Sequence, residues 1–205
     1  MSSAHWDNAY VAKAVDERSW TQPSPKESLQ YIATSGVSKD AEIIDIGGGS
    51  STLVDELLTS GFTHVSVLDI SHSALVEVKE RLTANGLDPT AVQWLCEDIT
   101  SWTPQKKYKL WHDRAVFHFL TSPEEQHHYL KAVNAGTESG SHIVMGTFAP
   151  TGPESCSGLP VTRWSVEQLQ QFFGEHYELV SGQLITHTTP WGSTQDFTWL
   201  HLKRK

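Results

Sequence analysis

The sequence predicts an α/β fold, in which a mostly parallel sheet is covered by helices on both faces. Apolar runs of strand length alternate with helix-like stretches from residue 25 onward, and a glycine-rich turn follows the first apolar run. An acidic residue also stands at or just after the end of three of these runs. Strands that are separated by helices of ten or more residues pair in parallel, because the connection must cross the sheet.

The elements alternate regularly through residue 147. Strand-like runs are predicted at 42–46, 64–70, 91–97, 108–112 and 142–147. Helices are predicted at 25–35, 52–60, 73–85 and 124–135. Asn85 and Gly86 form a typical stop signal for the third of these helices. The pattern therefore gives successive βαβ units.

The last third has a different pattern. A loop rich in Pro, Gly and Ser spans 149–160, and Ser165 with Gln168 predicts a capping box for a helix that ends at Phe173. Strands at 177–186 and 195–203 follow, joined by a turn-rich connection. So short a connection makes these two strands antiparallel, so we expect one reversed strand near the edge of the sheet.

Composition limits the kind of protein. The chain has 205 residues and 38 % hydrophobic residues, which predicts a single globular domain over 1–205. We expect an N-terminal lid at 1–38, a cofactor-binding core at 39–148 and a C-terminal part at 149–205. The net charge of −9 disfavours nucleic acid as a partner. No apolar run reaches membrane-spanning length, so we expect a cytoplasmic protein.

The glycine-rich turn carries the strongest functional signal. Gly47 and Gly49 follow Asp45 at the end of the first strand, and glycines there let a ligand lie against the backbone. The second strand ends in Asp69, 20 residues after Gly49, and the third leads into Asp98. Carboxyl ends of parallel strands meet at one edge, so the three acids should face one crevice.

With these motifs the sequence resembles the class I S-adenosylmethionine-dependent methyltransferases, with a Rossmann-like seven-stranded sheet of order 3-2-1-4-5-7-6. The resemblance implies S-adenosyl-L-methionine as cofactor and S-adenosyl-L-homocysteine as product. It further implies that Asp45 orients the methionine amino group, and that Gly47 and Gly49 let the cofactor pass. It also implies that Asp69 holds the ribose and that Asp98 with Ile99 holds the adenine. The cofactor-binding residues carried over are Asp45, Gly47, Gly49, Asp69, Ile70, Asp98 and Ile99.

The segment after the fourth strand faces the transferable methyl group in that family. The resemblance therefore makes Asp113, Arg114 and His118 candidates for the substrate side. Lys109 stands where many members have an acid, and this departs from the family pattern. For Arg114 a structural ion pair, and for His118 a packed and partly buried ring, are the alternative interpretations.

The N-terminal stretch carries a Trp, an acid and a Tyr within residues 6–10, followed by Trp20. It resembles the segment that precedes the core in protein lysine methyltransferases that act on elongation factors or citrate synthase. Such a segment can fold over the cofactor and exclude water, with Trp20 against the ligand. A strap of Trp residues anchored on the core is the alternative.

Competing functions have weaker signals. A dinucleotide dehydrogenase would need a third glycine where Thr52 stands, and a Ser-His-Asp hydrolase would need a G-x-S-x-G elbow. Neither the two cysteines, Cys96 and Cys156, nor the histidines have metal-ligand spacing, so no metal site is predicted.

We therefore expect methyl transfer to a small-molecule acceptor by direct displacement. A protein lysine methyltransferase and a non-catalytic cofactor-binding subunit remain as alternatives. The sequence predicts neither the acceptor nor the oligomeric state.

Overall fold

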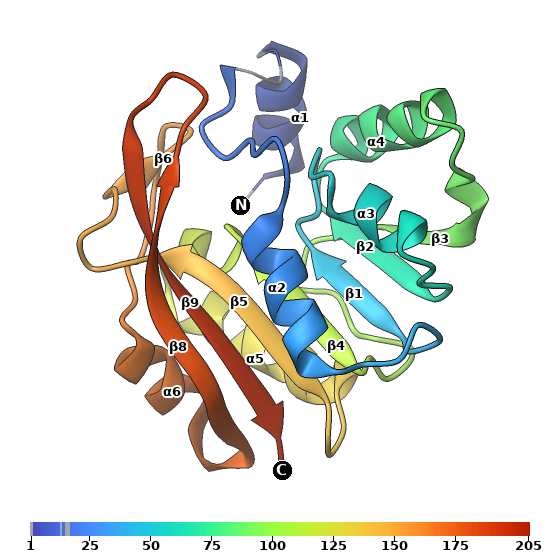
Figure 1. Ribbon diagram of the computed structural model, residues 1–205. Coiled ribbons are helices and arrows are strands. Elements are labelled where there is room, and N and C mark those ends of the chain that lie inside the picture. The colour runs from blue at the N-terminus through green and yellow to red at the C-terminus, as the bar shows by residue number, and fades with distance from the viewer. Residues whose placement is uncertain (1, 13, 15–16) are drawn as a thin grey trace.

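A computed structural model describes residues 2–12, 14 and 17–205. Seven strands form one sheet in the order β3-β2-β1-β4-β5-β9-β8, which confirms the predicted order once the small β6–β7 ladder is set aside (Figure 1). The first five strands of that order are parallel, and β9 runs antiparallel to both of its neighbours. The strands are β1 (Ile43–Ile46), β2 (Val65–Asp69), β3 (Val92–Cys96), β4 (Leu110–Arg114), β5 (His142–Phe148), β8 (Tyr177–Thr188) and β9 (Thr194–Arg204).

Helices cover both faces of the sheet (Figure 1). Successive residues of β1 show this, because Ile43 packs with the cluster under α2, α3 and α4, whereas Ile44 packs with the cluster under α5 and α6. The helices are α1 (Ser3–Ala12), α2 (Lys26–Ser35), α3 (Leu53–Thr59), α4 (His72–Ala84), α5 (Pro123–Gly136) and α6 (Val166–Phe173). Short 3₁₀ turns occupy Pro89–Ala91, Phe117–Phe119 and Gly174–His176.

The sequence explains where these elements begin. Every residue of β1 and β2 is buried, as expected for parallel strands with helices on both faces. Ser71 caps α4 by accepting the Ala74 amide. Capping boxes begin α5 and α6, and the one at Ser165 and Gln168 confirms the sequence prediction.

The segment between β5 and α6 differs from the loop that the sequence predicts. It contains a two-stranded antiparallel ladder of β6 (Ser155–Cys156) and β7 (Leu159–Pro160). Ser157 and Gly158 join the strands, and both have positive φ, at 53° and 76°. Two left-handed residues in a row are typical of a tight hairpin turn. Strands of two residues are too short to show an alternating apolar pattern, which is why sequence periodicity missed them.

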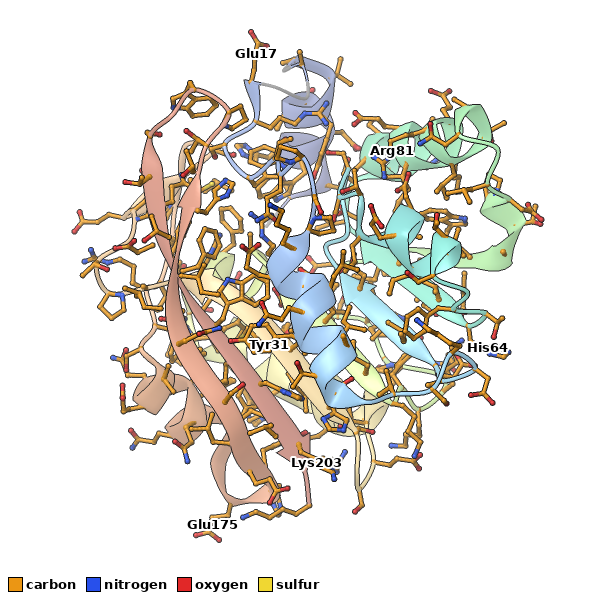
Figure 2. The ribbon with its side chains drawn as sticks, viewed as in Figure 1. Glu17, Tyr31, His64, Arg81, Glu175 and Lys203 are labelled. Carbon is orange, nitrogen blue, oxygen red and sulfur yellow. The ribbon has the colours of Figure 1, made fainter. Side chains whose placement is uncertain are left out.

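The C-terminal hairpin closes one side of the sheet. Trp199 of β9 is buried and stacks on Tyr31 of α2, with ring centroids 5.4 Å apart and an interplanar angle of 8°. Tyr31 projects from α2 toward this hairpin (Figure 2). Strand β8 lies at the outer edge and is largely exposed. Within the described ranges, none of the helices has the length and apolar character needed to cross a membrane.

Candidate active site

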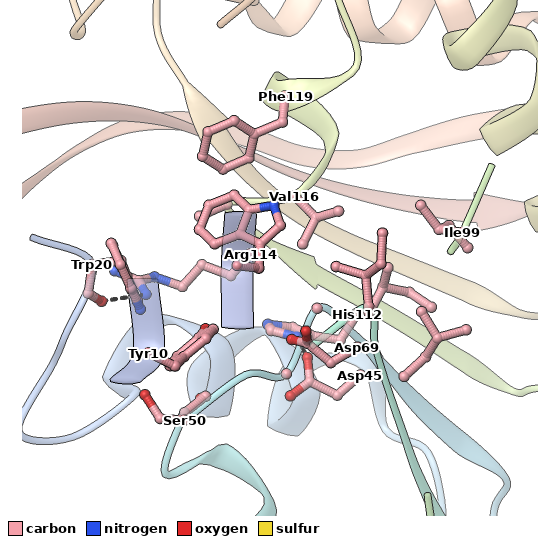
Figure 3. Close-up of a pocket in the computed structure, with 18 of the residues that line it drawn as sticks. Tyr10, Trp20, Asp45, Ser50, Asp69, Ile99, His112, Arg114, Val116 and Phe119 are labelled. Carbon is pink, nitrogen blue, oxygen red and sulfur yellow. Dashed lines mark hydrogen bonds and ion pairs between the residues drawn. The ribbon is translucent and has the colours of Figure 1, made fainter. Parts of the chain in front are cut away.

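A cavity of about 410 Å³ lies at the carboxyl ends of β1, β2 and β4, beneath α1 and the segment that follows it. It lies where ligands of open α/β sheets bind. Figure 3 shows Ile99 at one end and Trp20 at the other. Eight of the residues that the sequence singled out line the cavity: Trp20, Asp45, Gly47, Asp69, Ile70, Asp98, Ile99 and Arg114.

The glycine-rich turn adopts a conformation that favours glycine. Gly47 and Gly49 have positive φ, at 62° and 47°. A Cβ at Gly47 would overlap the Val116 side chain, and one at Gly49 would overlap the Tyr10 hydroxyl. Both the backbone angle and the lack of space therefore require glycine.

Asp69 connects this turn to the end of β2. Its side chain is buried, and its two carboxylate oxygens accept the Gly49 and Ser71 amides, each at 2.8 Å. Burial raises the pKa of Asp69 to about 6 in spite of these bonds. Each carboxylate oxygen has a second lone pair, so Asp69 can still accept hydrogen bonds from a ligand in the cavity.

The Asp45 carboxylate is held by His112 of the neighbouring strand β4. His112 of β4 places Nδ1 2.6 Å from the Asp45 carboxylate, and its Nε2 lies 2.9 Å from the Ser28 hydroxyl of α2. All three side chains are buried. This chain of contacts fixes the orientation of a carboxylate that lines the cavity. No local sequence pattern predicts this contact, because 67 residues separate Asp45 from His112.

Aromatic rings from the N-terminal segment form the cavity wall near Trp20. Trp6 lies 6.1 Å from Trp20 and 4.9 Å from Phe119, measured between ring centroids. Tyr10 lies 6.0 Å from Trp20. Because these rings all line the cavity, the N-terminal segment gives this end an apolar surface.

Two contacts attach the N-terminal segment to α4. Asp7 accepts a hydrogen bond from the Ser73 amide at 3.0 Å and one from the Ser71 hydroxyl at 2.7 Å, and these bonds lower its pKa. Arg18 makes a two-point ion pair with Glu77 at 2.8 and 2.9 Å. The sequence did not reveal either contact, because each joins residues more than fifty positions apart.

A second arginine supports the glycine-rich turn from outside. Arg81 of α4 donates to the Ser50 carbonyl at 2.8 Å and the Ser51 carbonyl at 2.7 Å, while it pairs with Asp55 at 2.7 Å. The turn is therefore held by Asp69 on one side and Arg81 on the other.

Arg114 ends β4 and points along the cavity toward Trp20 (Figure 3). Its Nη1 donates to the Trp20 carbonyl at 2.8 Å, whereas its Nη2 is buried without a hydrogen-bond partner. Burial lowers the pKa of Arg114 to about 10, which still leaves it charged at neutral pH. Ala115 follows with a φ of 69°, a strained value for a residue with a Cβ.

Asp113 and His118 do not line the cavity. Both are fully buried, and the carboxylate of Asp113 accepts hydrogen bonds from the Tyr129 hydroxyl at 2.7 Å and the Val116 amide at 3.1 Å. These bonds shape the turn after β4. Burial raises the pKa of Asp113 to about 6.

His118 packs in the core behind that turn. Its ring stacks on Phe148 at 4.2 Å between centroids, and its Nδ1 accepts the Phe148 amide at 3.3 Å. Burial lowers the pKa of His118 to about 3, so the ring is neutral at physiological pH. The catalytic roles expected for Asp113 and His118 therefore have no support in this geometry. The sequence analysis expected both residues after the fourth strand and on the substrate side, whereas Asp113 lies within β4 and neither side chain lines the cavity.

Comparisons with known proteins agree with the fold. Residues 43–140 match the family model described as a methyltransferase domain. The chain is 25 % identical to EEF1A lysine methyltransferase 2 of Danio rerio, over 86 % of this chain and 75 % of that protein.

Two solved structures share the fold. The N-methyltransferase NodS from Bradyrhizobium japonicum, in complex with S-adenosyl-L-homocysteine, has a TM-score of 0.73 at 13 % identity, covering 100 % of this chain and 99 % of that one. The glycopeptide N-methyltransferase MtfA, in complex with S-adenosyl-L-methionine, has a TM-score of 0.69 at 12 % identity, covering 94 % and 99 %.

The chain therefore carries a methyltransferase domain over residues 43–140, in the fold of the class I S-adenosylmethionine-dependent methyltransferases. In this methyltransferase the glycine-rich turn, Asp45, Asp69 and the Asp98–Ile99 pair all lie around one cavity or directly against it. The Val116 and Tyr10 side chains fill the space beside Gly47 and Gly49, and the strand-end carboxylates with Ile99 line the cavity next to this turn, so the residues present fit the cofactor.

Two other features of the methyltransferase concern a cysteine at the cavity and the residues that could bind a metal ion. Cys156 of β6 is buried and lines the cavity, with its Sγ 3.9 Å from the Ser19 hydroxyl. Among the residues that the structure describes, no group of three or more His, Cys, Asp or Glu is placed to hold a metal ion.

Proposed function

We propose that this methyltransferase transfers the methyl group of S-adenosyl-L-methionine to a small-molecule acceptor. The observation that carries the proposal is the shape of the cavity. At about 410 Å³ it is within the range of small-ligand sites, and the N-terminal segment covers it. Its polar end has Asp69 and Asp98, and its other end has an aromatic wall of Trp6, Trp20 and Phe119.

Each residue has a role in this proposal that follows from its position. Asp45, held by His112, accepts a hydrogen bond from the methionine amino group. Asp69 accepts hydrogen bonds from the ribose hydroxyls, and Ile70, Asp98 and Ile99 surround the adenine. Gly47 and Gly49 let the cofactor pass close to the backbone. These assignments rest on the lining of the cavity and on the family resemblance.

Methyl transfer requires little from the protein beyond alignment of the acceptor with the methyl group. Bound S-adenosyl-L-methionine supplies a methyl group that is already activated by its positively charged sulfur. The aromatic residues at the Trp20 end exclude water and orient the acceptor for in-line attack. His118 and Asp113 lie behind the turn after β4, so neither takes a proton from the acceptor in this proposal.

A protein lysine acceptor is the second candidate, and the similarity to EEF1A lysine methyltransferase 2 over 86 % of this chain supports it. The cavity argues against it, because the Arg114 guanidinium beside the Trp20 end would repel a lysine ammonium. A covered cavity is also a poor fit to a protein segment.

An acceptor screen tests the proposal. The purified protein is incubated with S-adenosyl-L-methionine and either a pool of small thiols, amines, phenols and carboxylic acids or a pool of proteins that includes elongation factors, and release of S-adenosyl-L-homocysteine is measured. We expect release with the small-molecule pool. Release only with proteins would establish the lysine alternative. Tight cofactor binding without release from either pool would point to a non-catalytic subunit.

A further inference from the structure

Arg81 and Arg114 line the cavity, Arg18 contacts the lining residue Glu77, and the partners of these three arginines differ. Arg18 pairs with Glu77 and Arg81 pairs with Asp55, so each guanidinium faces a carboxylate. Among the described residues, Arg114 has only the neutral Trp20 carbonyl as a hydrogen-bond partner, and its guanidinium lies 5.4 Å from the centroid of the Phe197 ring. A buried charge without a counter-ion destabilises a folded protein, so a retained one calls for an explanation.

The acids nearest to Arg114 are already engaged. Asp45 and Glu27 both stabilise its charge at a distance. However, Asp45 is bonded to His112 at 2.6 Å, and Glu27 accepts a hydrogen bond from Gln22 at 3.0 Å. The Nη2 group of the charged Arg114 guanidinium therefore has no acceptor among the described residues.

A second donor at the same end of the cavity has no acceptor. The indole Nε1 of Trp20 is buried without a hydrogen-bond partner, although Trp20 lines the cavity and binds Arg114 through its carbonyl. Buried donors are nearly always paired in native proteins. Two unpaired donors on neighbouring residues therefore indicate an acceptor group that arrives with a ligand.

The backbone supports this reading. Ala115 holds a left-handed φ of 69° directly after Arg114, and its amide donates to the Gly146 carbonyl at 2.8 Å. Backbone strain of this kind persists where the surrounding structure requires it, and it often marks a binding site. Here Arg114 is the last residue of β4, and both it and the strained Ala115 line the cavity.

We propose that the methyl acceptor carries a carboxylate, which binds Arg114 Nη2 and Trp20 Nε1. This inference rests on the proposed small-molecule function and adds the class of substrate. A single negative charge fits best, because Asp45 and Glu27 would repel a dianion. The uncharged part of the acceptor lies against Trp6 and Phe119. An adjoining cavity of about 80 Å³ is lined by Arg114, His187 and Glu27, and the Glu27 carboxylate there disfavours a second negative charge on the acceptor.

Binding of matched probes tests the proposal. The protein is saturated with S-adenosyl-L-homocysteine, and the affinities of acetate, butyrate, benzoate and phenylacetate are compared with those of their amides by ligand-observed NMR. We expect at least one carboxylate to bind about tenfold or more tightly than its amide. Arg114→Met should abolish this preference and Arg114→Lys should reduce it. Arg163→Met is the matched control, because Arg163 pairs with Glu154 outside the cavity lining.

The cofactor has a carboxylate of its own, so a second arm compares S-adenosyl-L-methionine with its decarboxylated form. If Arg114→Met weakens binding of the former alone, Arg114 holds the cofactor and the proposal is overturned. Equal binding of every carboxylate and amide, or a preference that survives Arg114→Met, also overturns it. Failure of the wild-type protein to bind S-adenosyl-L-homocysteine would instead contradict the proposed function. Circular dichroism shows whether Arg114→Met folds, and Arg114→Lys provides the test if it does not.

Discussion

Asp69 combines burial with two backbone hydrogen bonds, and its pKa of about 6 shows that ionisation in this environment is costly. A charged carboxylate kept in such a place is typical of a ligand-binding residue. The Asp69 carboxylate can accept strong hydrogen bonds from a bound ligand.

Asp69→Ala should therefore weaken binding of S-adenosyl-L-methionine by about 1 to 3 kcal/mol, because hydrogen bonds to a charged group are lost. Calorimetric titration measures the change. Asp88→Ala is the control, since Asp88 is exposed and caps a 3₁₀ turn away from the cavity. Unchanged affinity in Asp69→Ala would remove the ribose assignment.

His118 affects stability rather than chemistry in this structure. Its pKa falls from 6.5 in an unfolded chain to about 3, so protonation favours unfolding and its stabilising effect is lost as the pH falls below about 6.5. His118→Phe removes the imidazole that takes up this proton and keeps an aromatic ring against Phe148.

The free energy of unfolding of His118→Phe, measured relative to that of the wild type, should increase by about 2 to 3 kcal/mol when the pH is lowered from 7 to 4.5. Urea denaturation at the two pH values measures this gain, and affinity for the cofactor should stay unchanged. A free-energy difference that does not vary with pH would show that the ring is not buried in its neutral form.

The sequence predicted some residues of the site better than others. Asp45, Asp69 and Asp98 were identified because an acid at or just after a strand end has a fixed place in a parallel sheet. Asp113 and His118 were assigned to the substrate side from the family resemblance. Successive residues of a strand point to opposite faces, so Asp113 is buried in the core although Arg114, the next residue of β4, lines the cavity.

At the scale of elements, α1 and the segment after it are held mainly through α4. The Arg18–Glu77 ion pair has its arginine almost fully buried, with 3 % of the side chain exposed, whereas Glu77 is 31 % exposed. Removal of one partner from a buried pair leaves an uncompensated charge. The N-terminal cover of the cavity should therefore depend on this pair.

Glu77→Gln should lower the free energy of opening of the N-terminal segment by about 1 to 3 kcal/mol, less than for a fully buried pair because water screens Glu77. Hydrogen–deuterium exchange of Ser3–Ala12 should become faster by the corresponding factor. Glu138→Gln breaks the exposed Lys109–Glu138 pair and serves as the control. Equal exchange in both variants would show that Glu77 does not hold the segment.

Hydrophobic periodicity predicted the long strands and helices of the sheet and missed the short β6–β7 ladder. The five parallel strands, the helices between them and the C-terminal hairpin each extend over enough residues to show an apolar pattern. Predicted boundaries differ by up to two residues, as at β4, which begins at Leu110 and ends at Arg114. The β6–β7 ladder depends on the left-handed turn at Ser157 and Gly158, which apolar spacing does not encode.

At the scale of the whole molecule, contacts between distant segments build the site. The N-terminal segment, the turn after β1 and the end of β4 meet at one cavity, and the joining contacts span 59 residues for Arg18 and Glu77 and 94 for Arg114 and Trp20. Sequence patterns describe local structure, so they predicted the sheet and its strand-end acids but not these pairings.

The most direct test of the account is a calorimetric titration of the wild-type protein with S-adenosyl-L-methionine and, in parallel, with NAD. The turn after β1 has Thr52 where a dinucleotide-binding loop has its third glycine, so we expect binding of S-adenosyl-L-methionine in the micromolar range and no heat with NAD. Binding of NAD, or no binding of S-adenosyl-L-methionine, would contradict the assignment of the cavity.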